Sequence, residues 1–326
     1  PAQRVLASIV VALAVAAGAG LPVRAAETGA AEWLGRMAEA MRTRAYEGTL
    51  VYTHEGHIES MSVVHGYLDG REHERFRTLS GQPFEVIRMG ERVTCVWPAS
   101  RRVMVSQRPG DLLPPKPPRG FDALPEQYSA RPAGEARVAG RRARVIDVHP
   151  ADALRYGYRM WIDVESSLLL RSDLLDTEGA AVERLMFTEM RPLDSVSRAR
   201  FEPTLEGMSY AAHGDPGEGA TTLSDPPWRV TDLPAGFRAV SHRRQAMPPH
   251  GEAVQHSVFT DGLASVSVFV EPPDAGDMPL EGLSRMGAVH AFGLTRRGYH
   301  VTAVGEVPAV TVKRIARSVE RAGGGR

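Results

Sequence analysis

Cysteine and lysine are the residues that this sequence has least of. The single cysteine, Cys95, lies in the apolar run of residues 93–97. One thiol cannot form an intrachain disulfide, and we interpret it as a small buried core residue rather than a reactive thiol. Lysine occurs only at positions 116 and 313, yet acidic and basic side chains number 39 each. This balance produces no strong field and does not indicate a nucleic acid partner.

Motifs of the common catalytic sites are also missing. The sequence has no Gly-x-Ser-x-Gly, no P-loop, no glycine-rich dinucleotide turn and no Cys-x-x-Cys. The nearest approach to a metal site is the pair His54 and His57, which we place at a hairpin tip without a further ligand. We therefore predict no metal, no cofactor and no enzymatic activity. A hydrolase would need a nucleophile and base that the sequence does not reveal.

Four carboxylates fall around the turns of one β region: Asp163, Glu165, Asp173 and Asp176. A catalytic carboxylate pair is one interpretation. Solvated charges at turns are the other, and we favour it because charged side chains are mostly exposed.

Long apolar runs are missing except at the start of the sequence. Arg4 precedes an apolar stretch of residues 5–19, and Val23-Arg24-Ala25 follows with small residues where a signal peptidase reads them. The stretch is short for a bilayer span. We expect a signal peptide over residues 1–25, cleaved near Ala25, with an uncleaved anchor as the alternative.

A helix is predicted over residues 27–45, because Trp33, Leu34, Met37 and Met41 recur on one face. Alternation with period two, together with turn residues, predicts strands in most of the rest. They are expected at residues 49–54, 58–68, 73–79, 84–89, 92–97, 102–106, 143–149, 230–233, 237–243, 253–260, 264–271, 287–294 and 299–304.

The most regular β pattern covers residues 156–190 and predicts three antiparallel strands. In the first strand Met160 and Ile162 point one way while Arg159 and Trp161 point the other, which predicts one buried and one solvated face. We interpret this meander as a wall around an apolar concavity. Alternation alone nominates ten lining residues: Leu50, Tyr52, Met61, Val63, Phe84, Val86, Trp97, Val105, Met160 and Ile162. The alternative is that they fill an ordinary core and contact no ligand.

Composition divides the chain into two parts. Residues 206–227 are rich in Gly, Ser, Thr, Asp and Pro, which is typical of a linker. We therefore expect a domain over residues 26–205, a linker over 206–227 and a smaller domain over 228–326. In the smaller domain Arg238, Arg243 and Arg244 are candidates for docking an acidic partner; they could equally form one solvated strand face.

Three further segments carry expectations. The proline-rich residues 109–118 cannot join a central strand, and residues 111–120 are our candidate for a mobile flap. Residues 121–129 are predicted to form a short helix. Residues 308–322 are predicted to form a closing helix with Val310, Ile315 and Val319 facing inward.

In this order and spacing, the motifs of the sequence resemble those of the MucB/RseB family, over nearly the whole chain after the export signal. The motifs are YRMWIDVES at residues 158–166, RSDLLD at 171–176, Trp228 with LPAGF at 233–237, FTDGL at 259–263 and GEVP at 305–308. The family consists of periplasmic regulators of the envelope-stress sigma factor.

The resemblance implies a fold, a partner and a signal. The fold is α+β: a large antiparallel half-open β-barrel with helices on the concave side, similar to the lipoprotein carriers LolA and LolB, plus a smaller mixed α/β domain. The partner is the periplasmic part of a transmembrane anti-sigma factor, which is shielded from site-1 proteolysis. A lipid-like ligand, either lipoprotein acyl chains or lipopolysaccharide, would release it, and a homo-oligomer is also implied. A periplasmic lipoprotein or lipid carrier is the alternative function.

Overall fold

A computed structural model describes residues 29–106, 120–203, 209–211, 220–247, 252–272 and 280–322. The expected signal peptide over residues 1–25 lies outside the described residues. So do residues 107–119, which leaves only Gly120 of the expected flap.

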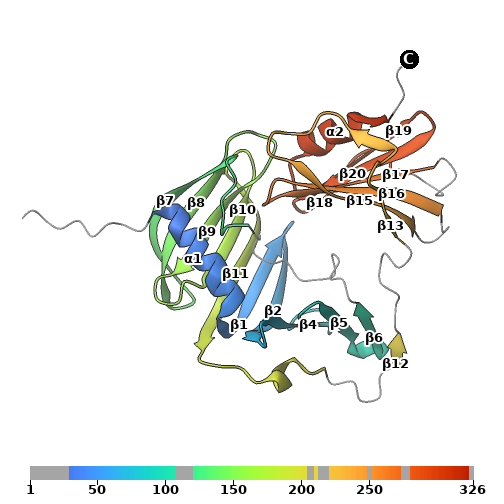
Figure 1. Cartoon of the computed structure of the whole chain (residues 1–326). Helices are drawn as coiled ribbons and strands as arrows, with labels where there is room; N and C mark the ends of the chain where they lie inside the picture. Colours follow the sequence, from blue (N-terminus) through green and yellow to red (C-terminus); the bar gives the residue numbers. More distant parts are fainter. Residues whose placement is uncertain are drawn as a thin grey trace, which may run out of the picture.

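Twelve strands form a larger sheet in the order β12-β6-β5-β4-β3-β2-β1-β11-β10-β9-β8-β7 (Figure 1). Every neighbouring pair is antiparallel except β12 and β6, which run parallel. The two edge strands are β12 and β7, so the described sheet does not close into a barrel. Its strands are β1 (Ala45–His54), β2 (His57–Leu68), β3 (Arg71–Thr78), β4 (Glu85–Met89), β5 (Arg92–Trp97), β6 (Arg102–Ser106), β7 (Tyr128–Val138), β8 (Arg141–Pro150), β9 (Gly157–Asp163), β10 (Leu169–Leu175), β11 (Ala181–Leu193) and β12 (Ser209–Ala211).

Tight turns connect the first strands as their residues predict. Asp69 and Gly70 both take positive φ between β2 and β3, the conformation that a two-residue hairpin turn requires. The decisive pairing is not local: β1 pairs along its whole length with β11. This pairing joins the hairpins of β2 to β6 to the meander of β9 to β11, and so makes one continuous sheet.

Helix α1 (Ala30–Thr43) lies against one face of the larger sheet (Figure 1). Its predicted apolar face is confirmed: Leu34 and Met37 are buried and Met41 is partly buried. Leu34 and Met37 pack on residues of β7 to β10, while Ala40 packs on β1, β2 and β11. The helix therefore contacts both halves of the sheet.

A smaller sheet of seven strands follows, in the order β13-β15-β16-β17-β20-β19-β18, and a further pair joins β14 to β21. Helix α2 (Ala309–Arg317) packs on β19 and β20, with Ile315 fully buried. The strands are β13 (Thr221–Thr222), β14 (Trp228–Val230), β15 (Arg238–Met247), β16 (Glu252–Thr260), β17 (Ser265–Glu271), β18 (Gly282–Met286), β19 (Val289–Arg296), β20 (Tyr299–Gly305) and β21 (Val319–Arg321); the short 3-10 helices of the chain are η1 (Pro98–Ser100) and η2 (Arg198–Phe201).

The short helix expected at residues 121–129 is wrong, and the closing helix is present but shorter than expected, with Ile315 facing inward as predicted. Residues 121–127 form turns and coil, and strand β7 begins at Tyr128. The closing helix ends at Arg317, after which Val319 is buried in β21, and Val310 points outward with 50% of its surface exposed. Described parts of the expected linker contribute the short strands β12 and β13.

The solvated face predicted for the meander is also wrong. Trp161 and Asp163, which point away from Met160, are both buried. The guanidinium of Arg171 lies 4.0 Å from the centroid of the Trp161 ring and covers it. Strand β9 is therefore buried on both faces except at Arg159, although only β8 and β7 separate it from the edge of the sheet.

Within the described residues, neither helix is long and apolar enough to cross a membrane.

Candidate functional site

A cavity of about 380 Å³ opens between helix α1 and the larger sheet. Its walls come from α1, from strands β1 to β4 and β11, and from the segment at residues 120–122. The lining residues are Gly35, Met37, Ala38, Glu39, Met41, Arg42, Tyr46, Leu50, Val63, Glu72, Glu74, Phe76, Arg88, Gly120, Asp122, Leu185 and Phe187. Most of the wall is apolar, and charged side chains from α1, β3, β4 and the segment at residues 120–122 contribute the rest. A mostly apolar wall with some polar groups is typical of sites for small ligands.

Two of the ten nominated lining residues, Leu50 and Val63, line this cavity. Met61 belongs to the same buried cluster, with Tyr52 packed against it. Met160 and Ile162 lie in the neighbouring cluster beneath Leu34 and do not reach the cavity wall. Tyr52 does not line the cavity either, and its hydroxyl donates a hydrogen bond to Glu183 over 2.6 Å.

The other four nominated residues lie in β4 to β6 or just before β4. Val86 and Cys95 pair across β4 and β5, and Phe84 and Trp97 pack beside them with ring centroids 5.0 Å apart. The register pairs Val105 with Thr94, so Val105 faces the opposite side of the sheet from Cys95. Its nomination as a lining residue alongside the other nine is therefore wrong.

Cys95 is a buried core residue, as the sequence predicts. Cys95 is free and fully buried. Burial raises the pKa of its thiol to about 11, which leaves it protonated at neutral pH and weakly nucleophilic.

One group of charged residues in the cavity wall is centred on Arg88. This buried side chain forms ion pairs with Glu72 and, over 2.7 Å, with Glu74. Nearby, the rings of Tyr46 and His65 stack with centroids 4.8 Å apart. Burial lowers the pKa of His65, so this residue packs as a neutral ring.

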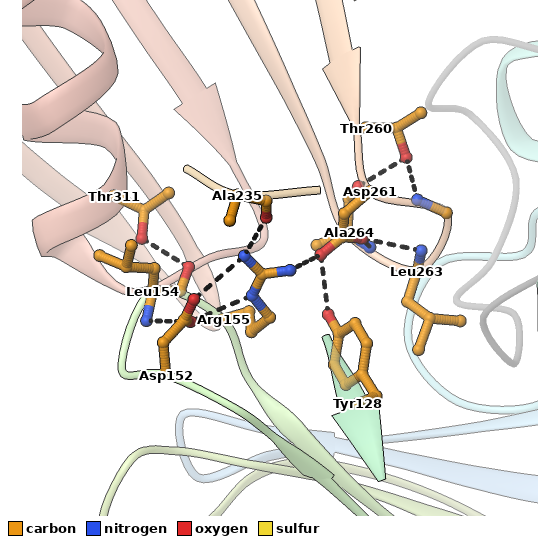
Figure 2. A network of polar contacts seen from close by, with 11 residues as sticks. Tyr128, Asp152, Leu154, Arg155, Ala235, Thr260, Asp261, Leu263, Ala264 and Thr311 are labelled. Carbon is orange, nitrogen blue, oxygen red and sulfur yellow. Dashed lines mark hydrogen bonds and ion pairs between the residues drawn. The ribbon is translucent and has the colours of Figure 1, made fainter. Parts of the chain in front are cut away.

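A second site is the junction, by which we mean the contact of residues 120–128, 152–156 and 183 with residues 234–237, 260–264, 287–290 and 311. Figure 2 shows the part of it around Arg155. At its centre is Arg155, which is completely buried. Its guanidinium donates to Asp261 over 2.7 Å, to the Ala235 carbonyl over 2.7 Å and to both oxygens of Asp152. One side chain from the connection between β8 and β9 thus contacts the two turns that contain Ala235 and Asp261.

Asp261 receives several donors at once. Its Oδ2 accepts hydrogen bonds from Arg155 and from the Tyr128 hydroxyl, the latter over 3.1 Å, and its Oδ1 accepts from the backbone of Leu263 and Ala264. A fully buried carboxylate with these partners is well satisfied. Thr311 of α2 adds a hydrogen bond of 2.6 Å to the Leu154 carbonyl.

Residues 120–128 connect the cavity to the junction. Gly120 and Asp122 line the cavity. Gly120 has φ +104, and a Cβ there would lie 2.4 Å from the Gly262 carbonyl oxygen. At the other end of the segment Tyr128 bonds to Asp261. The segment therefore lies against both the cavity and the turn at Gly262.

A second contact of the junction surrounds Glu183 of β11. Its carboxylate accepts from Tyr52 and, over 3.0 Å, from the Ala288 backbone. Tyr156 donates to the Ala288 carbonyl over 3.2 Å. Glu306 lies in the same region: burial of its carboxyl group, followed by the charge of Glu183, raises the pKa of Glu306 to about 7.

The carboxylates around the meander turns have structural partners. Asp173 accepts hydrogen bonds from Arg171 and Arg184, and Asp163 accepts from Arg141 and Ser166. Burial opposes ionisation of both groups, but these hydrogen bonds outweigh it and lower both pKa values. Glu165 is exposed and shares Arg141 with Asp163, while Asp176 accepts hydrogen bonds from the backbone of its own turn.

The three arginines nominated for partner docking do not share one face. The register pairs Arg243 with His256 and Arg244 with Gln255, neighbours that point to opposite faces. Arg238 is paired with Thr260 and lies on the face of Arg243. Both ideas about these residues, a single docking cluster and a single solvated face, therefore fail for Arg244.

At the hairpin tip, His54 and His57 have ring centroids 5.7 Å apart. Among the described residues no group of three or more His, Cys, Asp or Glu side chains is placed to hold a metal ion.

Sequence reasoning missed Arg155 and Asp152, and it treated Asp261 only as a turn residue. Asp261 does lie in one of the motifs that carry the family resemblance, as does Ala235. These motifs thus mark the junction rather than the cavity.

Comparisons with known proteins agree across the chain. Residues 29–205 match the MucB/RseB N-terminal domain, and residues 222–320 match the MucB/RseB C-terminal domain. The sigma factor AlgU regulatory protein MucB of Pseudomonas aeruginosa is 33% identical over 301 residues, which cover 89% of this chain and 90% of that protein. The sigma-E factor regulatory protein RseB of Escherichia coli is 28% identical over 297 residues, which cover 88% and 89%.

One solved structure with a similar fold is a complex. The structure of the Pseudomonas aeruginosa MucA/MucB complex matches with a TM-score of 0.70 and 29% identity, covering 90% of this chain and 98% of that chain.

Proposed function

The chain belongs to the MucB/RseB family, and from this premise we propose that it is a regulatory binding protein of the bacterial periplasm. It binds the periplasmic part of a transmembrane anti-sigma factor, shields that segment from site-1 proteolysis and so restrains the envelope-stress sigma factor. Its role is binding and not catalysis.

The similarity to MucB is the observation that carries this proposal. The match extends over 89% of the chain and includes both family regions. A fold with a TM-score of 0.70 to the MucA/MucB complex supports comparable surfaces for a comparable partner. The exposed outward face of β15 around Arg238 and Arg243 is our candidate for contacting an acidic stretch of the partner.

Release by a lipid-like signal is the second part of the proposal. The cavity beneath α1 is apolar over most of its wall, with Leu50, Phe76 and Phe187 among its lining residues. An acyl chain from a lipoprotein or lipopolysaccharide fits this chemistry. Residues 120–128 connect this wall to the turn at Gly262, which supports a route from ligand to partner surface.

The organisation that accompanies this function is also a proposal. It comprises a signal peptide cleaved near Ala25, a half-open barrel domain over residues 26–205, a linker over residues 206–227 and a smaller domain over residues 228–326. Self-association into a homo-oligomer belongs to the same proposal, and light scattering of the chain without its signal peptide checks it.

A lipoprotein or lipid carrier is the second candidate, and the cavity favours it. A carrier would bind acyl chains through the same wall, with the smaller sheet as an accessory. It would not bind an anti-sigma factor.

Calorimetric titration separates the two. Residues 26–326 are titrated with the periplasmic segment of the anti-sigma factor from the same genome, with and without lipopolysaccharide. The regulatory function predicts saturable binding that weakens when the lipid is present. Absence of binding to the anti-sigma segment, with retained binding of an acyl probe, would instead establish the carrier.

A further inference from the structure

A second pocket, of about 280 Å³, lies on the larger sheet on the face opposite to α1. The register explains its composition. One row across β11, β1, β2 and β3 runs Arg191, Glu47, Val64, Arg75, and the next row runs Glu189, Thr49, Ser62, Arg77. Arg200 of η2 completes the lining. Because Val63 faces the cavity, both rows of alternate residues face away from it.

Four guanidiniums surround this pocket. Arg77, Arg191 and Arg200 are 56%, 65% and 49% exposed as side chains, whereas Arg75 is 16% exposed. Arg75 is fixed by an ion pair with Glu85 and by a hydrogen bond of 3.0 Å to the Arg200 carbonyl. Arg77 is also paired with Glu85, over 3.3 Å. The arrangement thus combines one largely buried arginine with three ion-paired arginines that still reach solvent.

The pocket floor offers further polar groups. Thr49 and Ser62 are directly paired on neighbouring strands, so their hydroxyl groups lie side by side. The strand register of β1 shifts between Thr49 and Leu50, and a Cβ on Gly48 would lie 2.3 Å from the Glu189 carbonyl oxygen. The lack of a side chain at Gly48 therefore allows the close approach of β11 at this point.

Acidic groups in the lining are fewer than basic ones. Glu47 and Glu189 face four arginines. Glu47 forms ion pairs with both Arg191 and Arg200, the latter over 2.7 Å, and its side chain is only 18% exposed. It holds these two guanidiniums together beside the pocket, and any anion entering would compete with it.

We propose that this pocket binds an oxyanion of the phosphate class. Arginine is the side chain best suited to phosphate, because its planar fork makes paired charge-assisted hydrogen bonds. The guanidinium groups of Arg191, Arg200 and Arg77 supply the charged hydrogen-bond donors. The hydroxyl groups of Thr49 and Ser62 supply neutral ones. Since the pocket and the cavity open on opposite faces of β1 and β2, this binding is separate from an acyl chain in the cavity.

Phosphate could arrive free or as part of a lipid headgroup, and two probes distinguish these sources. Residues 26–326 are titrated with inorganic phosphate against chloride at matched ionic strength. Co-sedimentation is then measured with vesicles of phosphatidylcholine alone and with added phosphatidic acid. Saturable binding of phosphate, or selective binding of the phosphatidic acid vesicles, supports the site and identifies the source. Absence of both overturns it.

Two variants test the residues. The double variant R191Q/R200Q removes two forks and should weaken binding by at least about tenfold, given the strength of charge-assisted hydrogen bonds. Its control is R137Q/R142Q, which removes the same charge from a cross-strand pair in the β7–β8 hairpin. Equal weakening by both double variants would mean non-specific attraction and would overturn the site.

Glu47→Gln provides a gain-of-function test that a misfolded protein cannot imitate. It frees Arg191 and Arg200 and should tighten phosphate binding. Glu135→Gln, which removes an acid paired with Arg142 and Arg144 in the same distant hairpin, should leave binding nearly unchanged. Binding that is not tightened by Glu47→Gln contradicts the proposed competition and the site with it.

Discussion

Arg155 donates a hydrogen bond to Asp261 across 2.7 Å, although 106 residues separate them in the chain and both side chains are fully buried. Neither charge has water as an alternative partner. The ion pair therefore stabilises the contact between the parts of the chain that carry the two sheets, and loss of either residue leaves the other charge buried without its partner.

Removing Arg155 should have a large effect. Arg155→Gln leaves Asp261 buried without its cation, and we expect a loss of roughly 3–5 kcal/mol in the free energy of unfolding. Urea denaturation measures it. Arg159→Gln is the control, since Arg159 forms an ion pair with Asp147 but is 44% exposed, and it should lose less than about 1 kcal/mol. Similar losses in the two variants would show that the junction is not tightly docked in solution.

Gly120 should tolerate no side chain. In Gly120→Ala the new Cβ would meet the Gly262 carbonyl oxygen, so the segment must move away from the turn. Gly134 is a matched control, because it has the same φ of +104 and a Cβ added there would have nothing within 4 Å. We expect faster amide exchange at residues 260–264 in Gly120→Ala but not in Gly134→Ala. Equal exchange in the two variants would indicate backbone strain alone.

Filling the cavity should prevent acyl binding. Ala38 is partly buried on the face of α1 that lines the cavity, so Ala38→Phe places an aromatic ring in the space. We expect saturable binding of a fluorescent acyl probe to be lost while the unfolding midpoint changes little. Ala31→Phe, at an exposed position of the same helix, should retain binding. Unchanged probe affinity in Ala38→Phe would place the lipid elsewhere.

Glu306 should make stability depend on pH. Its pKa is raised from 4.5 to about 7 in the folded protein, so folding favours the neutral carboxyl group. The contribution of this group to stability is therefore complete below about pH 4.5 and declines as the pH rises to about 7. Glu306→Gln should flatten this decline, measured by urea midpoints at pH 5 and pH 8.

The exposed Glu178, which lies in a surface turn, provides the control for this measurement. Glu178→Gln should keep the slope of the wild-type protein. A Glu306→Gln variant with that same slope would assign the pH dependence to other groups.

Local patterns were sufficient to predict most elements. Helix α1 and the β2–β3 hairpin, whose turn contains Asp69, follow from periodicity and turn residues, which act over a few positions. The short helix expected at residues 121–129 failed because Pro125 interrupts the segment and because contacts with Gly262, distant in sequence, hold it in an irregular path. Propensity carries no information about such contacts.

The side of the sheet to which a residue points was harder to predict than the positions of the strands. Val103 is buried against Val96 on one face of β6, while Met104 packs near Cys95 on the other. With apolar residues on both faces, alternation does not say which face is the inner one, and Val105 was misassigned for this reason. Nor could any local pattern reveal the junction, since Arg155 and Asp261 meet only in the folded chain.

The pairing of β1 with β11 affects how the newly made polypeptide folds. Tyr52 and Glu183, which bond across that pair, are 131 residues apart. Until the later strand has been made, the earlier one presents an unpaired edge, and edges of this kind invite association with other chains. Contacts of such sequence separation form slowly. A newly synthesised molecule therefore passes through an interval in which its first hairpins need protection from aggregation.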